Sequence, residues 1–210
     1  MSAELQQMHM RNAFTPLDPA TLTPKQKSQT LESHLFLKEK RDSTVKGRMV
    51  AGGNKQRSYT PKEEATSPTA ALESVMLTAT IDAEEGRDVA IVDLPNAFIQ
   101  TDVGNEMITM RLRGKLAELM VKIAPEIYKS YVTLDAKGNM VLYVQLQKAV
   151  YSLMKAALMF YLKLSKALKS IGFVINPYNP CVANSIINGK QMTVVWHVDD
   201  MKVFMLTRTK

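Results

Sequence analysis

The stretch Met192–Asp200, with the sequence MTVVWHVDD, leads from apolar residues into two adjacent carboxylates, and apolar residues resume at 203–206. Two apolar stretches on either side of a short polar break are typical of two strands joined by a tight turn. The turn would carry Asp199 and Asp200 at its tip. A dry core does not accept adjacent acids, whereas Mg²⁺ binds carboxylate oxygens. The stretch therefore predicts an antiparallel hairpin with a metal-binding tip.

A third carboxylate, Asp93, ends another apolar run, at Asp88–Val92. Carboxylates at neighbouring strand ends suit two divalent ions about 4 Å apart, the arrangement that catalyses phosphoryl transfer. Mg²⁺ needs only a few carboxylates, because waters and phosphates complete its coordination shell. Acids are common in turns for other reasons, so the hypothesis of a two-metal site depends on Asp93 together with Asp199 and Asp200.

The composition predicts a globular protein of 210 residues with a net charge of +7. No apolar stretch approaches the roughly 18 residues that a membrane span needs, and the first residues lack the pattern of a signal peptide. We therefore expect no membrane partner. The single cysteine, Cys181, excludes an internal disulfide and a structural zinc site built on cysteines. It fits a reducing compartment inside the cell, cytoplasm or nucleus.

Positive charge is concentrated in residues 20–60, which contain nine basic residues and three acidic ones. A basic lobe with an acidic cluster elsewhere in the chain suits a polyanionic partner such as nucleic acid. The alternative interpretation is a solvated loop region without a binding role.

The order of predicted elements indicates an α+β fold. Residues 1–30 are expected to be poorly structured, because prolines interrupt them. One helix is predicted from Ser67 to Glu85, because serine suits the N-cap and the proline after it suits the first turn. Another is predicted over Met154–Ile171. The remaining runs predict strands and hairpins, so residues 31–210 are expected to form one domain in which helices cover one face of a mostly antiparallel sheet.

Blocks of the chain resemble, in order, the motifs of the reverse transcriptase domain of Ty1/copia-type retrotransposons, over about residues 30–210. The blocks are Lys46–Gly53 (KGRMVAGG, resembling K-A-R-L-V-A-x-G), Ser67–Ser74 (SPTAALES, resembling A-P-V-x-x-x-x-S), Val92–Gln100 (VDLPNAFIQ, resembling D-V-x-x-A-F-L-x-G), Leu146–Leu153 (LQKAVYSL, resembling L-x-K-A-L-Y-G-L) and His197–Asp200 (HVDD, resembling Y-V-D-D). Each block alone is a modest signal, whereas all of them in this order are specific.

The resemblance implies the fingers and palm of a right-hand polymerase and RNA-directed DNA polymerase activity. Such an enzyme transfers nucleotides from dNTPs to a primer 3′-hydroxyl on an RNA or DNA template. It implies that Asp93, Asp199 and Asp200 are catalytic and hold Mg²⁺, with Mn²⁺ as the alternative ion. Asp93 and Asp199 would be the main ligands, helped by the backbone of Leu94.

The resemblance also implies a nucleotide-binding set. Lys46 and Arg48 would contact the triphosphate, and the planar guanidinium suits phosphate. Phe98 would lie under the incoming sugar and exclude a 2′-hydroxyl, although an aromatic residue after a strand is also an ordinary core residue. Tyr151 and Ser152 would line the nucleotide pocket.

The chain departs from the family pattern at His197, Gly52, Ser152 and the pair Met154-Lys155, where the usual order of a basic and an amide residue is replaced. His197 stands where the family has tyrosine, as in some algal copia-like elements, and it would contact the primer or else be a plain strand histidine. Gly52 replaces a basic residue, and Ser152 replaces a glycine and would crowd the pocket. The histidine is not read as inactivating, whereas the changes at Gly52, Ser152 and Met154-Lys155 are read either as tolerated variation or as drift in an unselected copy.

The family pattern continues with a thumb and a ribonuclease H domain, for which this chain has no counterpart, and integrase and protease modules are also missing. We therefore expect a truncated polymerase from a larger Pol polyprotein. Two functional hypotheses follow: an active polymerase domain, or a degenerate, catalytically inactive fragment that still binds nucleic acid. A third interpretation is an unrelated α+β domain with a chance pair of acids.

Overall fold

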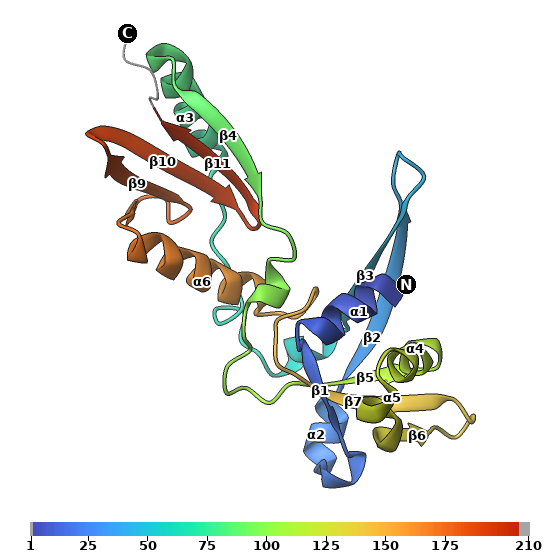
Figure 1. Ribbon diagram of the computed structural model, residues 1–210. Helices are drawn as coiled ribbons and strands as arrows, with labels where there is room; N and C mark the ends of the chain where they lie inside the picture. The colour runs from blue at the N-terminus through green and yellow to red at the C-terminus, as the bar shows by residue number, and fades with distance from the viewer. Residues whose placement is uncertain (1, 206–210) are drawn as a thin grey trace. The chain divides into compact units, whose positions relative to one another are not determined.

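The computed structural model describes residues 2–205, so Leu206, the last residue of the predicted final strand, lies outside them. The chain divides into two compact units (Figure 1). The first unit contains the chain up to Ala65 together with Phe98–Ala156, and the second contains Thr66–Ala97 together with the chain from Ala157. This division differs from the expected single domain over residues 31–210, because each unit is assembled from two separate segments.

The first unit is built on a six-stranded sheet in the order β1-β7-β5-β2-β3, with β6 paired to β7 beside this path. Its strands are β1 (Phe14–Leu17), β2 (Leu31–Glu39), β3 (Val45–Ala51), β5 (Thr109–Arg113), β6 (Val132–Leu134) and β7 (Met140–Leu146). The short pairing of β2 with β5 is parallel, and the other pairs are antiparallel.

Short helices surround this sheet. They are α1 (Ser2–Met10), α2 (Pro24–Gln29), α4 (Lys115–Ile123) and α5 (Pro125–Tyr128), with 3₁₀ turns η1 (Pro19–Thr21), η2 (Gly53–Ser58), η3 (Phe98–Gln100) and η4 (Lys129–Tyr131). Within residues 2–205, no helix is long and apolar enough to cross a membrane.

The first thirty residues are structured, which differs from the expectation. Leu5 and Met8 of α1 are fully buried, and β1 forms four register pairs with β7. The prolines do not interrupt this segment, because Pro16 lies in a strand at one end of the sheet order and Pro24 begins a helix, where its missing N–H is not needed. In this segment, prolines lie within a strand and at the start of a helix and do not indicate a lack of secondary structure.

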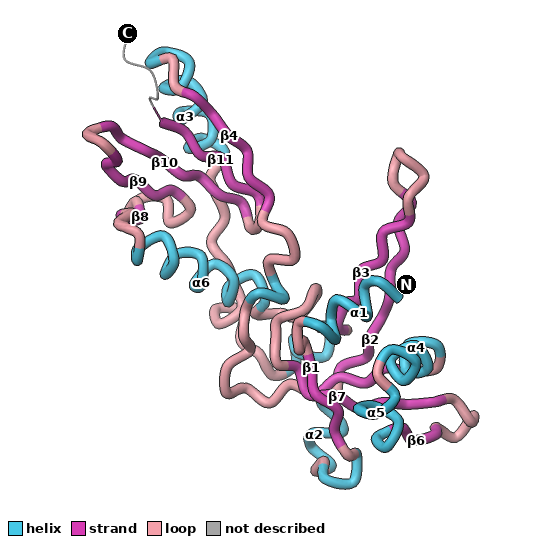
Figure 2. The backbone as a smooth tube through the Cα atoms, in the orientation of Figure 1, coloured by secondary structure: helices cyan, strands magenta, loops and turns pink. Residues whose placement is uncertain are grey.

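The second unit contains a wholly antiparallel sheet in the order β4-β11-β10-β9-β8 (Figure 2). Its elements are α3 (Leu72–Glu85), β4 (Asp88–Asp93), α6 (Ala156–Ser170), β8 (Val174–Ile175), β9 (Val182–Ile187), β10 (Lys190–His197) and β11 (Asp200–Met205). The predicted α+β class with an antiparallel sheet is therefore confirmed, and the predicted hairpin over residues 192–205 is observed as β10 and β11.

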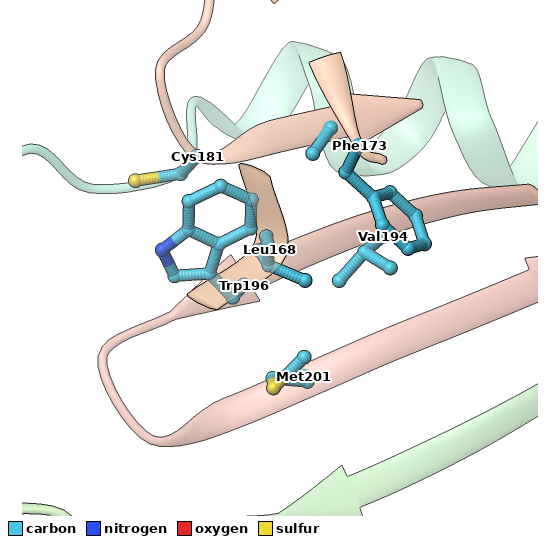
Figure 3. Packing of buried hydrophobic residues seen from close by; sticks show 7 residues of the cluster. Leu168, Phe173, Cys181, Val194, Trp196 and Met201 are labelled. Carbon is cyan, nitrogen blue, oxygen red and sulfur yellow. The ribbon is translucent and has the colours of Figure 1, made fainter. Parts of the chain in front are cut away.

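One face of this sheet packs against α6. Leu168 of α6 lies in a buried cluster with Phe173, Val194, Trp196 and Met201 (Figure 3). The ring of Tyr161, also on α6, stacks on that of Trp196 with 6.2 Å between the ring centroids. The helix ends at Ser170, close to the predicted end at Ile171.

The opposite face packs against α3, where Val75 contacts the buried cluster of Val182, Val195 and Phe204. Neighbouring residues of a strand point to opposite faces. Val194 therefore lies on the face covered by α6, and Val195 lies on the face covered by α3. A helix thus lies on each face, which differs from the expected covering of a single face.

Helix α3 begins at Leu72, later than the predicted start at Ser67. The Ser67 hydroxyl donates to the carbonyl oxygen of Pro68 at 3.2 Å and so does not cap the helix. The predicted end is confirmed, because Gly86 takes a left-handed conformation with φ of 62° after Glu85.

Strand β4, which carries Asp93 at its end, lies at one end of the sheet order. Among the described residues it pairs with β11 alone. Its apolar side chains are consequently exposed, Ile91 by 74% and Val89 by 47%.

Candidate functional site

Three of the predicted site residues share one face of the second sheet. Asp93 is directly opposite Asp200 in the pairing of β4 with β11, and Asp200 is directly opposite His197 in the pairing of β11 with β10. Side chains of directly opposite residues point to the same face, with about 4.5–5.5 Å between their Cβ atoms. All three are exposed. The hairpin therefore brings two carboxylates and an imidazole together at the same end of three neighbouring strands.

Asp199 lies in the two-residue loop between β10 and β11, beside Val198. Its carbonyl oxygen accepts a hydrogen bond from the N–H of Leu94 at 3.0 Å, which continues the pairing beyond the end of β4. The backbone of Leu94, a predicted ligand, is thereby tied to the hairpin tip through its N–H. The backbone of Val198 has a φ of 57°. A β-branched residue rarely adopts this conformation, so the tip holds local backbone strain.

The donor chemistry of this tip fits a divalent ion. Exposed carboxylate oxygens at two neighbouring strand ends are the ligands that Mg²⁺ takes. Two like charges directly opposite each other in a sheet are destabilising, and a bound cation would relieve this repulsion. Within residues 2–205, however, no three His, Cys, Asp or Glu side chains form a group that could hold a metal ion. The predicted carboxylates are thus neighbours along the sheet but are not gathered as a set of three.

A basic residue lies on the same face as Asp200. Lys202 is two positions further along β11, and its Nζ is 2.6 Å from a carboxylate oxygen of Asp82 on α3. Both side chains are largely buried. Removing one partner of a buried ion pair leaves an uncompensated charge, so this pair fixes α3 against the strand that carries Asp200. No sequence signal distinguished Asp82 from the other acids of its helix.

The predicted nucleotide-binding residues belong to the first unit. Lys46 and Arg48 are exposed on β3, where they lie opposite Lys38 and Phe36 of β2. Residues two apart in a strand share a face. The β2–β3 hairpin therefore presents one face that carries three cations and an aromatic ring.

Three of these residues contact one another through their side chains. The Arg48 guanidinium carbon lies 5.2 Å from the centroid of the Tyr151 ring. The Tyr151 ring meets the Phe98 ring edge to face, with 5.0 Å between the centroids. Cation–π and edge-to-face contacts each stabilise by about 1 kcal/mol. The contacts hold a cationic head beside two half-buried aromatic rings, so Phe98 is in contact with the predicted pocket residues.

Ser152 is the departure with a clear structural consequence. Its φ is 65°, in the left-handed region where glycine is favoured, and the family pattern has glycine at this position. The side chain of Ser152 is exposed. The replacement therefore strains the backbone of this loop.

Two residues of η2, Gly53 and Gln56, hold the Tyr151–Ser152 loop. A Cβ atom placed on Gly53 would lie 2.0 Å from the carbonyl oxygen of Ser152, so only glycine fits there. The buried Gln56 accepts a hydrogen bond from the N–H of Met154 at 2.9 Å through its Oε1. Gly53 matches the glycine that ends the first family block, whereas nothing in the sequence pattern around Gln56 distinguishes it.

The single cysteine belongs neither to the predicted metal-binding residues nor to the predicted nucleotide-binding residues. Cys181 is fully buried and unpaired with another sulfur, and burial raises the pKa of its thiol to about 11. The thiol therefore stays protonated at neutral pH, and a protonated thiol is a poor nucleophile and metal ligand.

Comparison with known proteins gives one family. The model of the family described as reverse transcriptase (RNA-dependent DNA polymerase) matches residues 22–207. No curated protein matches the chain significantly. Among solved structures, telomerase from Candida albicans, in complex with a TWJ fragment of telomeric RNA, is similar at 10% identity with a TM-score of 0.39. That match covers 96% of this chain and 41% of the telomerase chain.

Proposed function

Because the chain belongs to the reverse transcriptase (RNA-dependent DNA polymerase) family, we propose that it acts as the polymerase domain of a Ty1/copia-type element. In this proposal it joins dNTPs to a primer 3′-hydroxyl on an RNA or DNA template by two-metal chemistry. The substrates are a template–primer and dNTPs, and the cofactor is Mg²⁺, with Mn²⁺ as the alternative.

The observation that carries the proposal is the direct pairing of Asp93 with Asp200 on one exposed face. Like charges at directly opposite positions destabilise a sheet, and a bound divalent cation would offset their repulsion. Bound divalent ions would activate the primer 3′-hydroxyl and neutralise the leaving pyrophosphate. Asp93, Asp199 and Asp200 would hold them, together with the backbone of Leu94, and exposed His197 would contact the primer strand.

In the first unit, Arg48 and Lys46 would bind the triphosphate of the incoming dNTP. Arg48 already lies over the Tyr151 ring, which restricts its side chain and lowers the entropy lost on binding phosphate. Phe98 would support the sugar of the deoxynucleotide and reject a ribonucleotide through its bulk. Tyr151 and Ser152 would line the same pocket.

A second candidate is a catalytically inactive fragment that binds nucleic acid. Two observations favour it: the carboxylates within residues 2–205 do not form a group of three, and Ser152 holds a conformation suited to glycine. In this alternative the basic residues bind template–primer with an affinity that falls steeply with salt, and no extension occurs.

Primer extension on the purified chain tests the first candidate. We expect extension of a labelled primer with Mg²⁺ or Mn²⁺, and we expect it to fall below detection in Asp199→Asn. Asp88→Asn is the matched control, because Asp88 is an exposed acid at the other end of the strand that carries Asp93. Extension that survives in Asp199→Asn would contradict the site assignment, and its absence from every variant would favour the inactive fragment.

A second readout does not depend on turnover. A ligand that binds only the folded state raises the thermal midpoint, so Mg²⁺ or Mn²⁺ should stabilise the wild-type chain and Asp88→Asn more than Asp93→Asn. Equal stabilisation of all three would argue that the ions bind elsewhere.

A further inference from the structure

A polar pocket of about 210 Å³ lies in the first unit, and none of the predicted nucleotide-binding residues lines it. Its wall is formed by α2, η2 and the segment that leads into β5. The residues with polar side chains that line it are Gln26, Gln29, Gln56, Tyr59, Glu106 and Thr109. Pockets for drug-sized ligands are larger, about 300–1,000 Å³, so this one suits a fragment the size of a single planar base.

Some of these groups already have partners and form the wall. The Gln26 carboxamide caps α2 by accepting from the N–H and hydroxyl of Thr23. Gln56 accepts from the N–H of Met154, and the Thr109 hydroxyl is 3.0 Å from that of Thr30. These bonds fix the shape of the pocket before any ligand arrives.

Other groups keep hydrogen-bonding capacity for a ligand. The side chain of Gln29 makes no hydrogen bond to the described residues and is half-buried. Burial and the nearby Glu106 carboxylate raise the pKa of Tyr59 against a hydrogen bond from Gln56, so the Tyr59 hydroxyl stays protonated at neutral pH and its O–H can donate. The Nζ of Lys155 forms ion pairs with Glu64 at 3.3 Å and with one Glu106 oxygen at 3.6 Å, and the longer pair leaves the Glu106 carboxylate able to accept hydrogen bonds. The pocket thus offers a carboxylate acceptor, an amide and a phenol.

We propose that this pocket binds a guanine base of single-stranded nucleic acid. A carboxylate accepts two parallel hydrogen bonds, and guanine presents N1–H and N2–H as adjacent donors on its Watson–Crick edge. Adenine and cytosine place an acceptor beside their amino group, and uracil and thymine place carbonyl oxygens beside their single N–H. Glu106 would accept from guanine, while Gln29 or Tyr59 donates to O6. The carboxylate also excludes a phosphate as the occupant.

The surroundings of the pocket supply contacts for the rest of such a strand. Lys25 and Lys27 are exposed on α2 beside the glutamines, and Arg57 is exposed on η2 beside Gln56. Phosphate contacts position a strand without reading its sequence, whereas unpaired bases are read by hydrogen bonds to their edges. The identity of the strand as a template rests on the proposed function, whereas base binding itself does not.

Inosine tests the proposal, because it is guanosine without the 2-amino group. Binding of the full chain is measured by fluorescence anisotropy with pyrimidine 12-mers that contain one guanosine or one inosine. We expect the guanosine 12-mer to bind about tenfold more tightly, the discrimination typical of one good bidentate contact. Glu106→Gln should abolish this difference, and Gln29→Leu should reduce the affinity for the guanosine 12-mer. Glu126→Gln, an exposed acid of the same unit, is the matched control.

The salt dependence separates base contacts from phosphate contacts. Lys25→Ala should weaken both 12-mers alike and reduce the salt slope by about one unit, whereas Glu106→Gln should leave the slope unchanged. Circular dichroism verifies that each variant folds. Equal binding of guanosine and inosine 12-mers by the wild type, or a preference retained in Glu106→Gln, overturns the proposal. Primer extension that survives in Asp199→Asn would contradict the proposed function but would change neither binding result, so this proposal and the proposed function fail independently.

Discussion

Ser152 and Val198 share an unusual backbone, with φ values of 65° and 57°, yet their surroundings differ. The loop at Ser152 is tied from several directions: Gly53 packs on its carbonyl oxygen, Ala51 donates to the carbonyl of Tyr151 at 2.9 Å, and Gln56 accepts from Met154. The turn at Val198 is held by the β10–β11 pairing and by the bond from Leu94 to Asp199.

The difference shows two ways to maintain a strained residue at a candidate site. In the first unit, tertiary contacts from η2 determine the loop, so the strain is distributed over several interactions. In the second unit, the register of a hairpin determines the turn, so the strain is concentrated at one residue. Strained residues persist only where their surroundings over-determine them, and they cluster at functional sites.

The largest effect is expected from Gly53→Ala, which should disrupt the contacts that hold the Ser152 loop. The added methyl group would overlap the carbonyl oxygen of Ser152, so the loop or η2 must shift at a cost of about 3 kcal/mol. Hydrogen exchange should show faster exchange of the Met154 N–H in this variant. Trp196, the single tryptophan, is buried in the second unit, and its fluorescence transition should stay unchanged. Normal protection in residues 151–154 would show that the loop accommodates the methyl group.

The two strained residues are compared directly by glycine substitution. Val198→Gly should stabilise the second unit by about 1 kcal/mol, because a β-branched side chain is especially disfavoured at positive φ. Ser152→Gly should stabilise the first unit by only about 0.5 kcal/mol, because unbranched serine is less disfavoured at positive φ, while the entropy of glycine in the unfolded chain reduces both gains. Denaturant unfolding followed by Trp196 fluorescence should therefore respond to Val198→Gly and not to Ser152→Gly. A larger gain from Ser152→Gly than from Val198→Gly would mean that Ser152, and not Val198, carries the greater backbone strain.

The smallest effect is expected from the charges at the hairpin tip. Asp200→Asn removes the repulsion between directly opposite carboxylates, so without divalent ions it should stabilise the second unit by about 0.5 kcal/mol. Added Mg²⁺ should reverse this order by stabilising the wild type. The midpoint of the Trp196 transition, measured with EDTA and with Mg²⁺, provides the test. A variant less stable than the wild type in EDTA would show that Asp200 makes favourable contacts in the free protein.

The hairpin tip could be predicted from the sequence because its pattern is local. Apolar residues on both sides of Asp199 and Asp200 predict two strands and a turn, and the structure has β10 and β11 there. The direct pairing of Asp93 with Asp200 depends on which strands become neighbours and in what register. That choice is made by packing against α3 and α6, which a local pattern does not encode.

The support of the Ser152 loop was not predictable for the same reason. Gln56 and Met154 are 98 residues apart in the chain, and glutamine has no pattern that marks it as buried. The order of the N-terminal segment is not predictable from its local pattern, because its prolines resemble interruptions. Its order comes from tertiary contacts that bury the apolar residues Leu5 and Met8 completely. Short elements with little periodicity are decided by their neighbours rather than by their own sequence.

The exposed strand β4 has a consequence for how the protein behaves in solution. An outer strand that pairs on one side only, as β4 does within the described residues, and that exposes apolar Val89 and Ile91 is a template for adding further strands. Molecules that collide along this strand can extend each other's sheets, so self-association should increase with protein concentration. A lysine in place of Ile91 would act as a gatekeeper, and Ile91→Lys should keep the purified chain dispersed at concentrations where the wild type aggregates.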